Sequence, residues 1–205
     1  MQPEHPLNRP QARPNPRPKV LIDQQELARR VRELAGEIER DYSRVPLEGP
    51  GEDGAADAPR RLDDPLICVG VLTGSVFFLV DLLEEVVDLP VVVDFFQTSS
   101  YGSGTSPGEV RIKKDIDTSI RGRDVLLVED IVDTGFTLRT ILDLLRFRGA
   151  RSVRLCALLD KAARREVEVP IDYCGFPIDD VFVVGYGLDY DGLYRNLPYI
   201  GIMDE

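Results

Sequence analysis

One stretch of the sequence constrains the fold more than any other: residues 124–139, DVLLVEDIVDTGFTLR. It begins with an apolar run that is typical of a buried strand, and it continues through two adjacent acids. It then reaches a Thr-Gly-Phe-Thr sequence that suits the start of a helix. Open α/β sheets bind their ligands at the carboxyl ends of the strands, where such strand–turn–helix units place their turns. The stretch therefore predicts an α/β fold with a binding site at this turn.

The chain around this stretch alternates between strand-like and helix-like runs, which predicts βα units and a mostly parallel sheet. The predicted strands are residues 66–71, 91–96, 124–129 and 152–160, and the predicted helices are 76–87 and 137–149. A further amphipathic helix is predicted from Asp23 to about Ser43, because Asp23-x-x-Glu26 resembles a capping box and apolar residues then recur every three or four positions.

Two segments show no periodicity. The first eighteen residues hold six of the fifteen prolines and His5, the one histidine of the chain, so we predict a disordered, basic tail over residues 1–19 and a folded domain over 20–205. Residues 46–65 are rich in Pro, Gly, Ala and acids, and we predict a surface insertion there. Removing residues 1–17 or shortening 48–60 should change the activity little.

Composition excludes several classes of protein. The 205 residues carry 36 acidic and 25 basic side chains, a net charge of −11, so neither nucleic acid nor an anionic membrane is an expected partner. Cys68, Cys156 and Cys174 lie far apart in apolar runs, which indicates reduced core residues rather than disulfides or a metal site. No apolar run is long enough to span a membrane and no signal-like core is present, so a cytoplasmic location is expected.

The turn that follows the central strand carries the chemistry. Glu129 and Asp130 can hold hydroxyl groups or Mg²⁺, and a helix amino terminus with Gly135, Thr134 and Thr137 is a cradle for phosphate. The Gly-Lys-Ser/Thr of a Walker loop is missing, which favours a ribose phosphate. A purely structural role, in which the acids cap the helix and the glycine shapes the turn, explains single residues better than the whole string.

Residues 128–135, VEDIVDTG, resemble the phosphoribosyl pyrophosphate signature of the type I phosphoribosyltransferases. The Asp-Thr-Gly form is similar to that of the 6-oxopurine branch, the hypoxanthine-guanine phosphoribosyltransferases. Four other segments resemble, in order, the pyrophosphate loop and its helix, the flexible lid, the purine-lysine segment and the carboxyl-terminal hood of that family: 70–83, 93–112, 158–165 and 179–203. The resemblance spans about residues 20–203.

The resemblance implies a twisted parallel sheet flanked by helices, with a small hood formed by about residues 161–205 and part of the amino-terminal segment. It implies transfer of ribose 5-phosphate from 5-phosphoribosyl 1-pyrophosphate to N9 of hypoxanthine or guanine. The products would be IMP or GMP and pyrophosphate, the reaction of purine salvage, with Mg²⁺ as the cofactor. Family members form dimers and tetramers, so a homodimer or homotetramer is expected.

The resemblance also implies a role for each site residue. Asp133 would be the general base that accepts the purine N7 proton. The other residues of the sugar-phosphate site are Glu129 and Asp130 for the ribose hydroxyls and metal, Asp189 for metal, Asp133, Thr134, Gly135, Phe136 and Thr137 for the 5-phosphate, Leu72, Thr73, Gly74 and Arg195 for pyrophosphate, and Ser100 and Tyr101 in the lid.

Purine recognition would fall to Lys161, Phe182 and Val183. A lysine donates hydrogen bonds but cannot accept them, so Lys161 suits the O6 acceptor of a 6-oxopurine and not the amino group of adenine. Phe182 would stack on the base, and the backbone of Val183 would meet its exocyclic edge. Taken singly, the lysine is more typical of a surface charge and the phenylalanine of a core, so their spacing carries the interpretation.

Two departures and two alternatives accompany the resemblance. Thr73 and Phe136 stand where some relatives carry lysine, so affinity for the donor could differ. In the family, the peptide bond before the Thr73 position can be cis. One alternative is a regulator that binds RNA or DNA, but such relatives replace the base-position aspartate, and Asp133 is present. The other is a xanthine- or guanine-preferring enzyme, which should lack this hood sequence. The sequence does not rank hypoxanthine against guanine.

Overall fold

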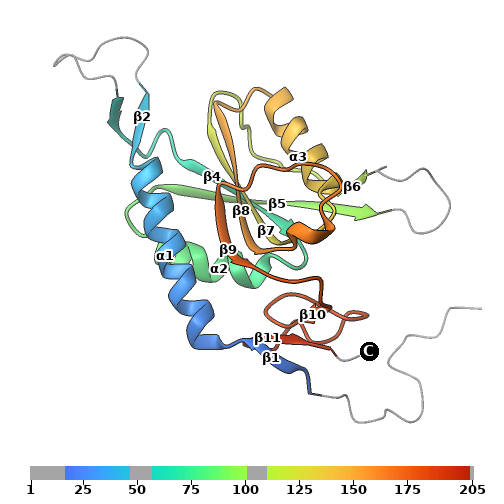
Figure 1. Ribbon diagram of the computed structural model, residues 1–205. Coiled ribbons are helices and arrows are strands. Elements are labelled where there is room, and N and C mark those ends of the chain that lie inside the picture. The colour runs from blue at the N-terminus through green and yellow to red at the C-terminus, as the bar shows by residue number, and fades with distance from the viewer. Residues whose placement is uncertain (1–16, 47–56, 101–109, 204–205) are drawn as a thin grey trace, which may run out of the picture.

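The computed structural model describes residues 17–46, 57–100 and 110–203, and its centre is a six-stranded sheet with the order β6-β5-β4-β7-β8-β9 (Figure 1). The strands are β4 (Leu66–Leu72), β5 (Val91–Ser100), β6 (Val110–Lys114), β7 (Asp124–Val132), β8 (Ser152–Asp160) and β9 (Tyr173–Pro177). Neighbouring strands are parallel except for β6, which pairs with β5 in antiparallel fashion at one edge. The predicted α/β fold with a mostly parallel sheet is confirmed.

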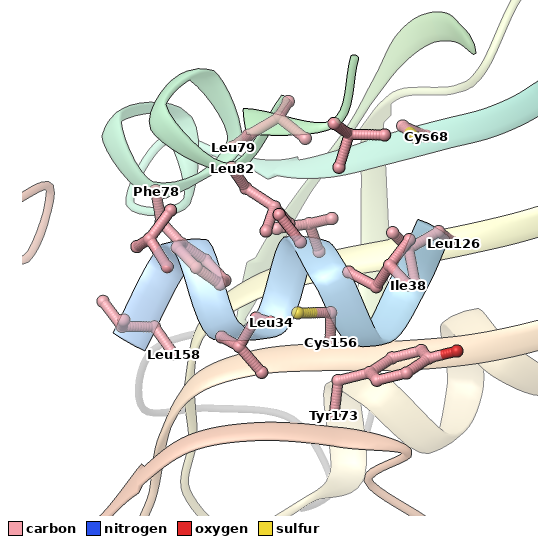
Figure 2. Close-up of a cluster of buried hydrophobic side chains, with 14 of the residues drawn as sticks. Leu34, Ile38, Cys68, Phe78, Leu79, Leu82, Leu126, Cys156, Leu158 and Tyr173 are labelled. Carbon is pink, nitrogen blue, oxygen red and sulfur yellow. The ribbon is translucent and has the colours of Figure 1, made fainter. Parts of the chain in front are cut away.

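Helices cover both faces of this sheet. Successive residues of β4 and β7, and most of those of β8, alternate between two hydrophobic cores, one on each face of the sheet. One core receives α1 (Gln24–Tyr42) and α2 (Val76–Glu85), and Figure 2 shows Leu34, Ile38 and Phe78 of these helices in one cluster with Cys68, Leu126 and Cys156 of the strands. The other core receives α3 (Phe136–Phe147). The layered arrangement leaves the ends of the strands as the places where loops can form a site.

The first helix follows its sequence pattern closely. The Asp23 carboxylate accepts a hydrogen bond from the Glu26 backbone N–H at 2.8 Å, which is the amino-terminal cap predicted from the sequence. Its buried residues recur at helical spacing: Leu27, Val31, Leu34, Ala35, Ile38 and Tyr42. The helix therefore forms where local capping and burial of one face agree.

A second, smaller sheet joins the two ends of the described chain. It has the order β1-β11-β10, formed by β1 (Lys19–Ile22), β10 (Val183–Val184) and β11 (Ile200–Ile202) in antiparallel pairs. This is the expected hood, which takes one strand from the amino-terminal segment. The predicted tail boundary is wrong by a short margin, because Pro18 is buried and Lys19 already pairs with Ile202.

The predicted insertion over residues 46–65 is also drawn too widely. Strands β2 (Arg44–Pro46) and β3 (Asp57–Pro59) form an antiparallel pair, and Arg60 directly after them is buried. Only residues 47–56 of this segment lie outside the described part of the chain. A deletion of 48–60 would remove a strand and a buried arginine, so the dispensable part is narrower than predicted.

Two predictions from composition concern the described residues. Cys68 and Cys156 are buried and Cys174 is half-buried, and all three are free thiols, as predicted. In the parts of the chain that the structure describes, no helix has the length and apolar character required to cross a membrane.

Candidate active site

The carboxyl ends of β4 and β7 meet at one edge of the large sheet. The two strands are parallel and pair directly, Gly70 beside Val128, so the loops that follow them are adjacent. A pocket opens there, which we call the acidic pocket. Its lining includes eleven of the predicted site residues: Leu72, Thr73, Gly74, Glu129, Asp130, Asp133, Thr134, Gly135, Thr137, Asp189 and Arg195. Thr98, near the end of β5 and within the predicted lid segment, also lines it and was not singled out from the sequence.

The loop after β4 packs tightly against the central strand and the hood. A Cβ atom added at Gly74 would overlap the Asp130 carboxylate, and one added at Gly187 would overlap the carbonyl oxygen of Gly74. Gly187 also has a φ of 102°, a conformation that favours glycine. The peptide bond between Leu72 and Thr73 is cis. The two glycines therefore allow three distant segments to form one wall of the pocket.

Glu129 and Asp130 place two carboxylates side by side in the acidic pocket. Oε2 of Glu129 is shielded from solvent and finds no hydrogen-bond partner among the described residues. Burial raises the pKa of Glu129 well above its ordinary value, and the neighbouring Asp130 charge adds to the effect. Burial likewise raises the pKa of Asp130 to about 6. The negative form of this pair is costly without a partner, so the site favours hydrogen-bond donors or a cation.

Helix α3 begins directly at the acidic pocket. Gly135 is its amino-terminal cap residue, in a left-handed conformation with a φ of 95°, and a glycine makes no side-chain cap. The first backbone N–H groups of a helix have no partner within the helix, so they are available to an anion. A Cβ at Gly135 would overlap the carbonyl oxygen of Val167, which explains the glycine sterically. Phe136 does not line the pocket, and its predicted contribution is its backbone N–H.

The hood contributes a charged pair to the same pocket. Arg195 Nη2 lies 2.7 Å from Asp189 Oδ1, and the other carboxylate oxygen of Asp189 accepts a hydrogen bond from the Gly192 N–H at 2.7 Å. Arg195 Nη1 donates to the carbonyl oxygen of Gly187. These contacts hold the hood loop so that one cation and one carboxylate face the loop after β4.

A second pocket adjoins the first, and we call it the adjoining pocket. It is lined by Asp130, Ile131, Asp133, Lys161, Arg164, Phe182, Val183, Leu188 and Asp189, of which Asp130, Ile131, Asp133 and Asp189 also line the acidic pocket. All three predicted purine-binding residues therefore meet at this place: Lys161 directly follows β8, Phe182 lies in the hood and Val183 begins β10.

Two of those residues have surroundings that suit a flat, polar-edged ligand. Lys161 is only 6% exposed, and the carboxylate nearest to its ammonium is that of Asp180, with Nζ and Oδ1 4.0 Å apart. Phe182 is half-exposed, and its ring meets that of Tyr190 edge to face with centroids 5.7 Å apart. The pocket thus offers a cationic donor that is not hydrogen-bonded to its carboxylate and an open aromatic face.

Sequence reasoning missed two arginines next to the predicted base. Arg164 Nε lies 3.2 Å from Asp133 Oδ1, and Arg165 Nε donates to the main-chain oxygen of Asp133 at 3.0 Å. Both belong to the segment 158–165, in which the sequence analysis singled out only Lys161. A contact across 31 or 32 positions leaves no local signal in the sequence. The predicted lid lies mostly outside the described residues: Tyr101 is not described, and of Ser100 only the backbone, at the end of β5, is.

Comparison with known proteins identifies the family of the chain. A model of the phosphoribosyl transferase domain matches residues 20–191. The bifunctional protein TilS/HprT of Listeria monocytogenes is 49% identical over 186 residues, which are 90% of this chain but 26% of that protein, so the chain spans about a quarter of that relative. The hypoxanthine-guanine phosphoribosyltransferase of Bacillus subtilis is 42% identical over 90% of this chain and 92% of its own length.

The fold is shared as well. A crystal structure of a hypoxanthine phosphoribosyltransferase from Staphylococcus aureus superposes with a TM-score of 0.78, at 41% identity over 91% of each chain. The chain therefore belongs to the phosphoribosyltransferase family, as its VEDIVDTG motif predicts. Within this family, its relatives are hypoxanthine and hypoxanthine-guanine phosphoribosyltransferases.

Proposed function

We propose that this protein is a purine salvage enzyme that transfers ribose 5-phosphate from 5-phosphoribosyl 1-pyrophosphate to N9 of hypoxanthine or guanine, the activity EC 2.4.2.8. One observation carries the proposal. The acidic pocket, which suits a sugar phosphate, and the adjoining pocket, which suits a purine, share Asp130, Ile131, Asp133 and Asp189. The two substrates would therefore meet where N9 can reach the anomeric carbon.

The donor would occupy the acidic pocket with its 5-phosphate at the start of α3. Backbone N–H groups of the first helical turn and the hydroxyls of Thr134 and Thr137 would hold this phosphate. Glu129 and Asp130 would accept hydrogen bonds from the ribose hydroxyls. Those donors would give the shielded Oε2 of Glu129 the partner that it lacks among the described residues.

The same carboxylates fit a magnesium ion. Mg²⁺ prefers oxygen ligands and is commonly held by one or two carboxylates together with substrate phosphates. The described part of the chain contains no group of three or more His, Cys, Asp or Glu residues arranged to hold a metal, so pyrophosphate oxygens would complete the coordination. Glu129 and Asp130 would hold the ion near the ribose, and Asp189 would hold one directly or through water. When bound, the ion would neutralise charge on the leaving pyrophosphate.

The chain's own groups would handle pyrophosphate and the proton. Arg195 and the backbone of the 72–75 loop would stabilise the pyrophosphate as the bond from the anomeric carbon to its oxygen breaks. The sugar passes through an oxocarbenium-like state, the bond from N9 to the anomeric carbon forms, and the N7 proton passes to the Asp133 carboxylate. Asp133 lines both pockets, as this role requires.

The substrate class would depend on Lys161. Its ammonium has three donor hydrogens and no acceptor, so it would pair with O6 of hypoxanthine or guanine and would face the amino group of adenine as donor against donor. Phe182 would stack on the ring, and the backbone of Val183 would meet the exocyclic edge. A site that leaves a buried donor unpaired discriminates strongly against the wrong ligand.

The proposal extends to assembly, location and competing roles. A homodimer or homotetramer in the cytoplasm is predicted, and light scattering that shows a monomer at working concentration would contradict the assembly. A regulator that binds nucleic acid is disfavoured by the net charge of −11 and by the aspartate at the base position.

A spectrophotometric assay with 5-phosphoribosyl 1-pyrophosphate and hypoxanthine, guanine, xanthine or adenine, each with Mg²⁺ or with a chelator, tests the proposal. We expect turnover of hypoxanthine, guanine or both, negligible turnover of adenine, and loss of turnover with the chelator. Turnover of xanthine ahead of both other oxopurines would favour the related branch. No turnover of any purine would contradict the proposed function.

A further inference from the structure

Two adjacent arginines hold the predicted base, Asp133, at two different points. Arg165 contacts the backbone: its Nε donates to the carbonyl oxygen of Asp133 at 3.0 Å, and its Nη2 donates to that of Val132 at 3.4 Å. Arg164 forms an ion pair with the side chain, with its Nε 3.2 Å from Asp133 Oδ1, and this oxygen accepts no hydrogen bond from any described residue. The base therefore sits between two cations that reach it from the segment after β8.

Arg165 links several parts of the fold through its side chain. Its guanidinium also forms an ion pair with Asp160 at the end of β8, at 2.5 Å, and its side chain is 17% exposed. Its Cδ lies 3.1 Å from the position of a Cβ at Gly135, so the side chain packs beneath the turn that leads into α3. One side chain thus ties the end of β8 to the backbone of the base and to the phosphate turn.

Arg164 has a different environment. It is half-exposed, lines the adjoining pocket, and lies between two carboxylates, with its Nη1 3.8 Å from Asp180 Oδ1. The same Asp180 oxygen is 4.0 Å from the Lys161 ammonium. Around the adjoining pocket the charges therefore alternate in the order Asp133, Arg164, Asp180, Lys161. In this order Arg164 forms ion pairs with both Asp133 and Asp180, and it shares Asp180 with Lys161.

We propose that Arg164 and Arg165 are positioning residues for Asp133, Arg165 through the backbone and Arg164 through the carboxylate. Arg164 acts through its charge, which restrains the carboxylate beside it, and Oδ1, which accepts no hydrogen bond from any described residue, is left able to accept the purine N7 proton. This inference rests on the proposed function, because it assigns partners to the base of that reaction. Proton transfer depends steeply on placement, and an error of about 1 Å can cost about 10²-fold in rate.

The two arginines should have separable effects on steady-state kinetics. Arg164→Gln removes the ion pairs with the Asp133 and Asp180 carboxylates but no contact to the backbone of the phosphate turn, so we expect kcat to fall about tenfold while KM for 5-phosphoribosyl 1-pyrophosphate stays within about twofold. Arg164→Lys keeps a cation within reach and should recover part of kcat. Arg165→Gln loosens the turn that carries both the base and the phosphate cradle, so kcat should fall and KM for the donor should rise.

Arg139→Gln is the matched control, because Arg139 pairs with Asp143 on the exposed face of α3, and it should keep wild-type kinetics. Thermal unfolding of each variant shows whether a loss of activity reflects a loss of folding. If Arg165→Gln does not fold, the two variants Arg164→Gln and Arg164→Lys still test the inference. Wild-type kcat in folded Arg164→Gln, or a rise in donor KM with kcat unchanged, would overturn it. An inactive wild type would instead contradict the proposed function itself.

Discussion

The two ends of strand β7 carry acidic residues in opposite surroundings. Asp124, the first residue of the strand, forms ion pairs with the buried Arg60 and with Arg151, the latter at 2.6 Å, and accepts a hydrogen bond from the Ser152 hydroxyl at 2.7 Å. Near the other end, Glu129 and Asp130 form no ion pair with any described residue. The same strand thus carries a paired charge at one end and two acids without an ion pair among the described residues at the other, where Asp130 accepts a hydrogen bond from the Ile131 N–H at 2.9 Å and Oε2 of Glu129 accepts none.

The difference appears in the pKa values of these carboxyl groups. Burial tends to raise the pKa of Asp124, but hydrogen bonds from Arg151, Ser152 and Arg60 outweigh it and hold the pKa well below the ordinary value. At the opposite end burial raises the pKa of both acids. We infer that the amino-terminal edge of the sheet contributes stability and the carboxyl-terminal edge gives up stability for binding.

The largest expected effect lies at the binding end. Asp133→Asn should lower kcat by about 10²–10⁴-fold, the usual contribution of a general base, while KM for the donor and the free energy of unfolding change little. Steady-state kinetics and urea denaturation measure the two quantities. Asp143→Asn, on the exposed face of α3, is a control that should leave both unchanged. Near wild-type turnover in Asp133→Asn would refute the role of the base.

At the amino-terminal end of β7, a substitution should change stability and leave turnover unchanged. Asp124→Asn leaves the guanidinium of Arg60 buried beside a neutral amide, which should lower the free energy of unfolding by about 3–5 kcal/mol while kcat of the folded fraction is kept. Because the folded pKa of Asp124 is lowered, its contribution is present above the unfolded pKa near 3.9 and fades as the pH falls toward the folded pKa. Urea denaturation at pH 7 and at pH 3 should show this loss shrinking. An equal loss at both pH values would contradict the account.

A smaller effect concerns the purine. Lys161→Gln should lower kcat/KM for hypoxanthine and guanine about ten- to a hundredfold, because a charge-assisted hydrogen bond contributes roughly 1.5–3 kcal/mol. The gap to adenine should narrow, since an amide can donate or accept. KM for the donor should move less, because the donor occupies the acidic pocket. Unaltered purine preference in this variant would mean that other groups recognise the purine.

The smallest effect is a gain in stability at the binding end. Glu129→Gln removes a buried carboxyl group whose ionisation is opposed by burial, so without ligand we expect the free energy of unfolding to rise by about 1 kcal/mol at pH 7.5. A carboxyl group with a raised pKa stabilises the fold at low pH and loses that contribution as the pH rises through the folded pKa, so the gain should vanish below about pH 4.

The same substitution should weaken binding of the donor with Mg²⁺, as measured by titration calorimetry. A variant that is less stable than wild type at pH 7.5, or that binds the donor equally well, would show that Glu129 is not held at a cost for its ligand. We therefore expect the free energy of unfolding to rise in Glu129→Gln and to fall in Asp124→Asn, although both substitutions remove a carboxylate from the same strand.

Much of this molecule follows from local sequence. The apolar run of β7, its two acids and the turn at Gly135 lie within twelve positions, so pattern and turn chemistry suffice to predict a strand, a helix start and a phosphate cradle. The capped helix α1 is equally local, because Asp23 bonds to a backbone group three residues on. The predicted purine and pyrophosphate residues came from the family resemblance, and the structure brings them to the two pockets.

The short strands β1, β2, β3, β10 and β11 were missed, since two to four residues show no period and gain their stability from a distant partner. Stabilisation by a distant partner also explains why the insertion over residues 46–65 was predicted too widely. Arg60 follows a Pro- and Gly-rich segment and reads as a surface charge, yet it pairs with Asp124, 64 positions away. No local pattern encodes such a contact.

The sequence by itself determined the class of fold, the central strand–turn–helix and the residue types of the site, because helix caps, strand periods and phosphate turns are properties of neighbouring residues. Only the tertiary structure decided which charges are paired. It places Gly74 against Asp130 and Arg164 and Arg165 on Asp133, and it leaves Glu129 without a partner among the described residues. Burial and pairing depend on the packing of the whole chain, so the energetic difference between the two ends of β7 exists only once the sheet has formed.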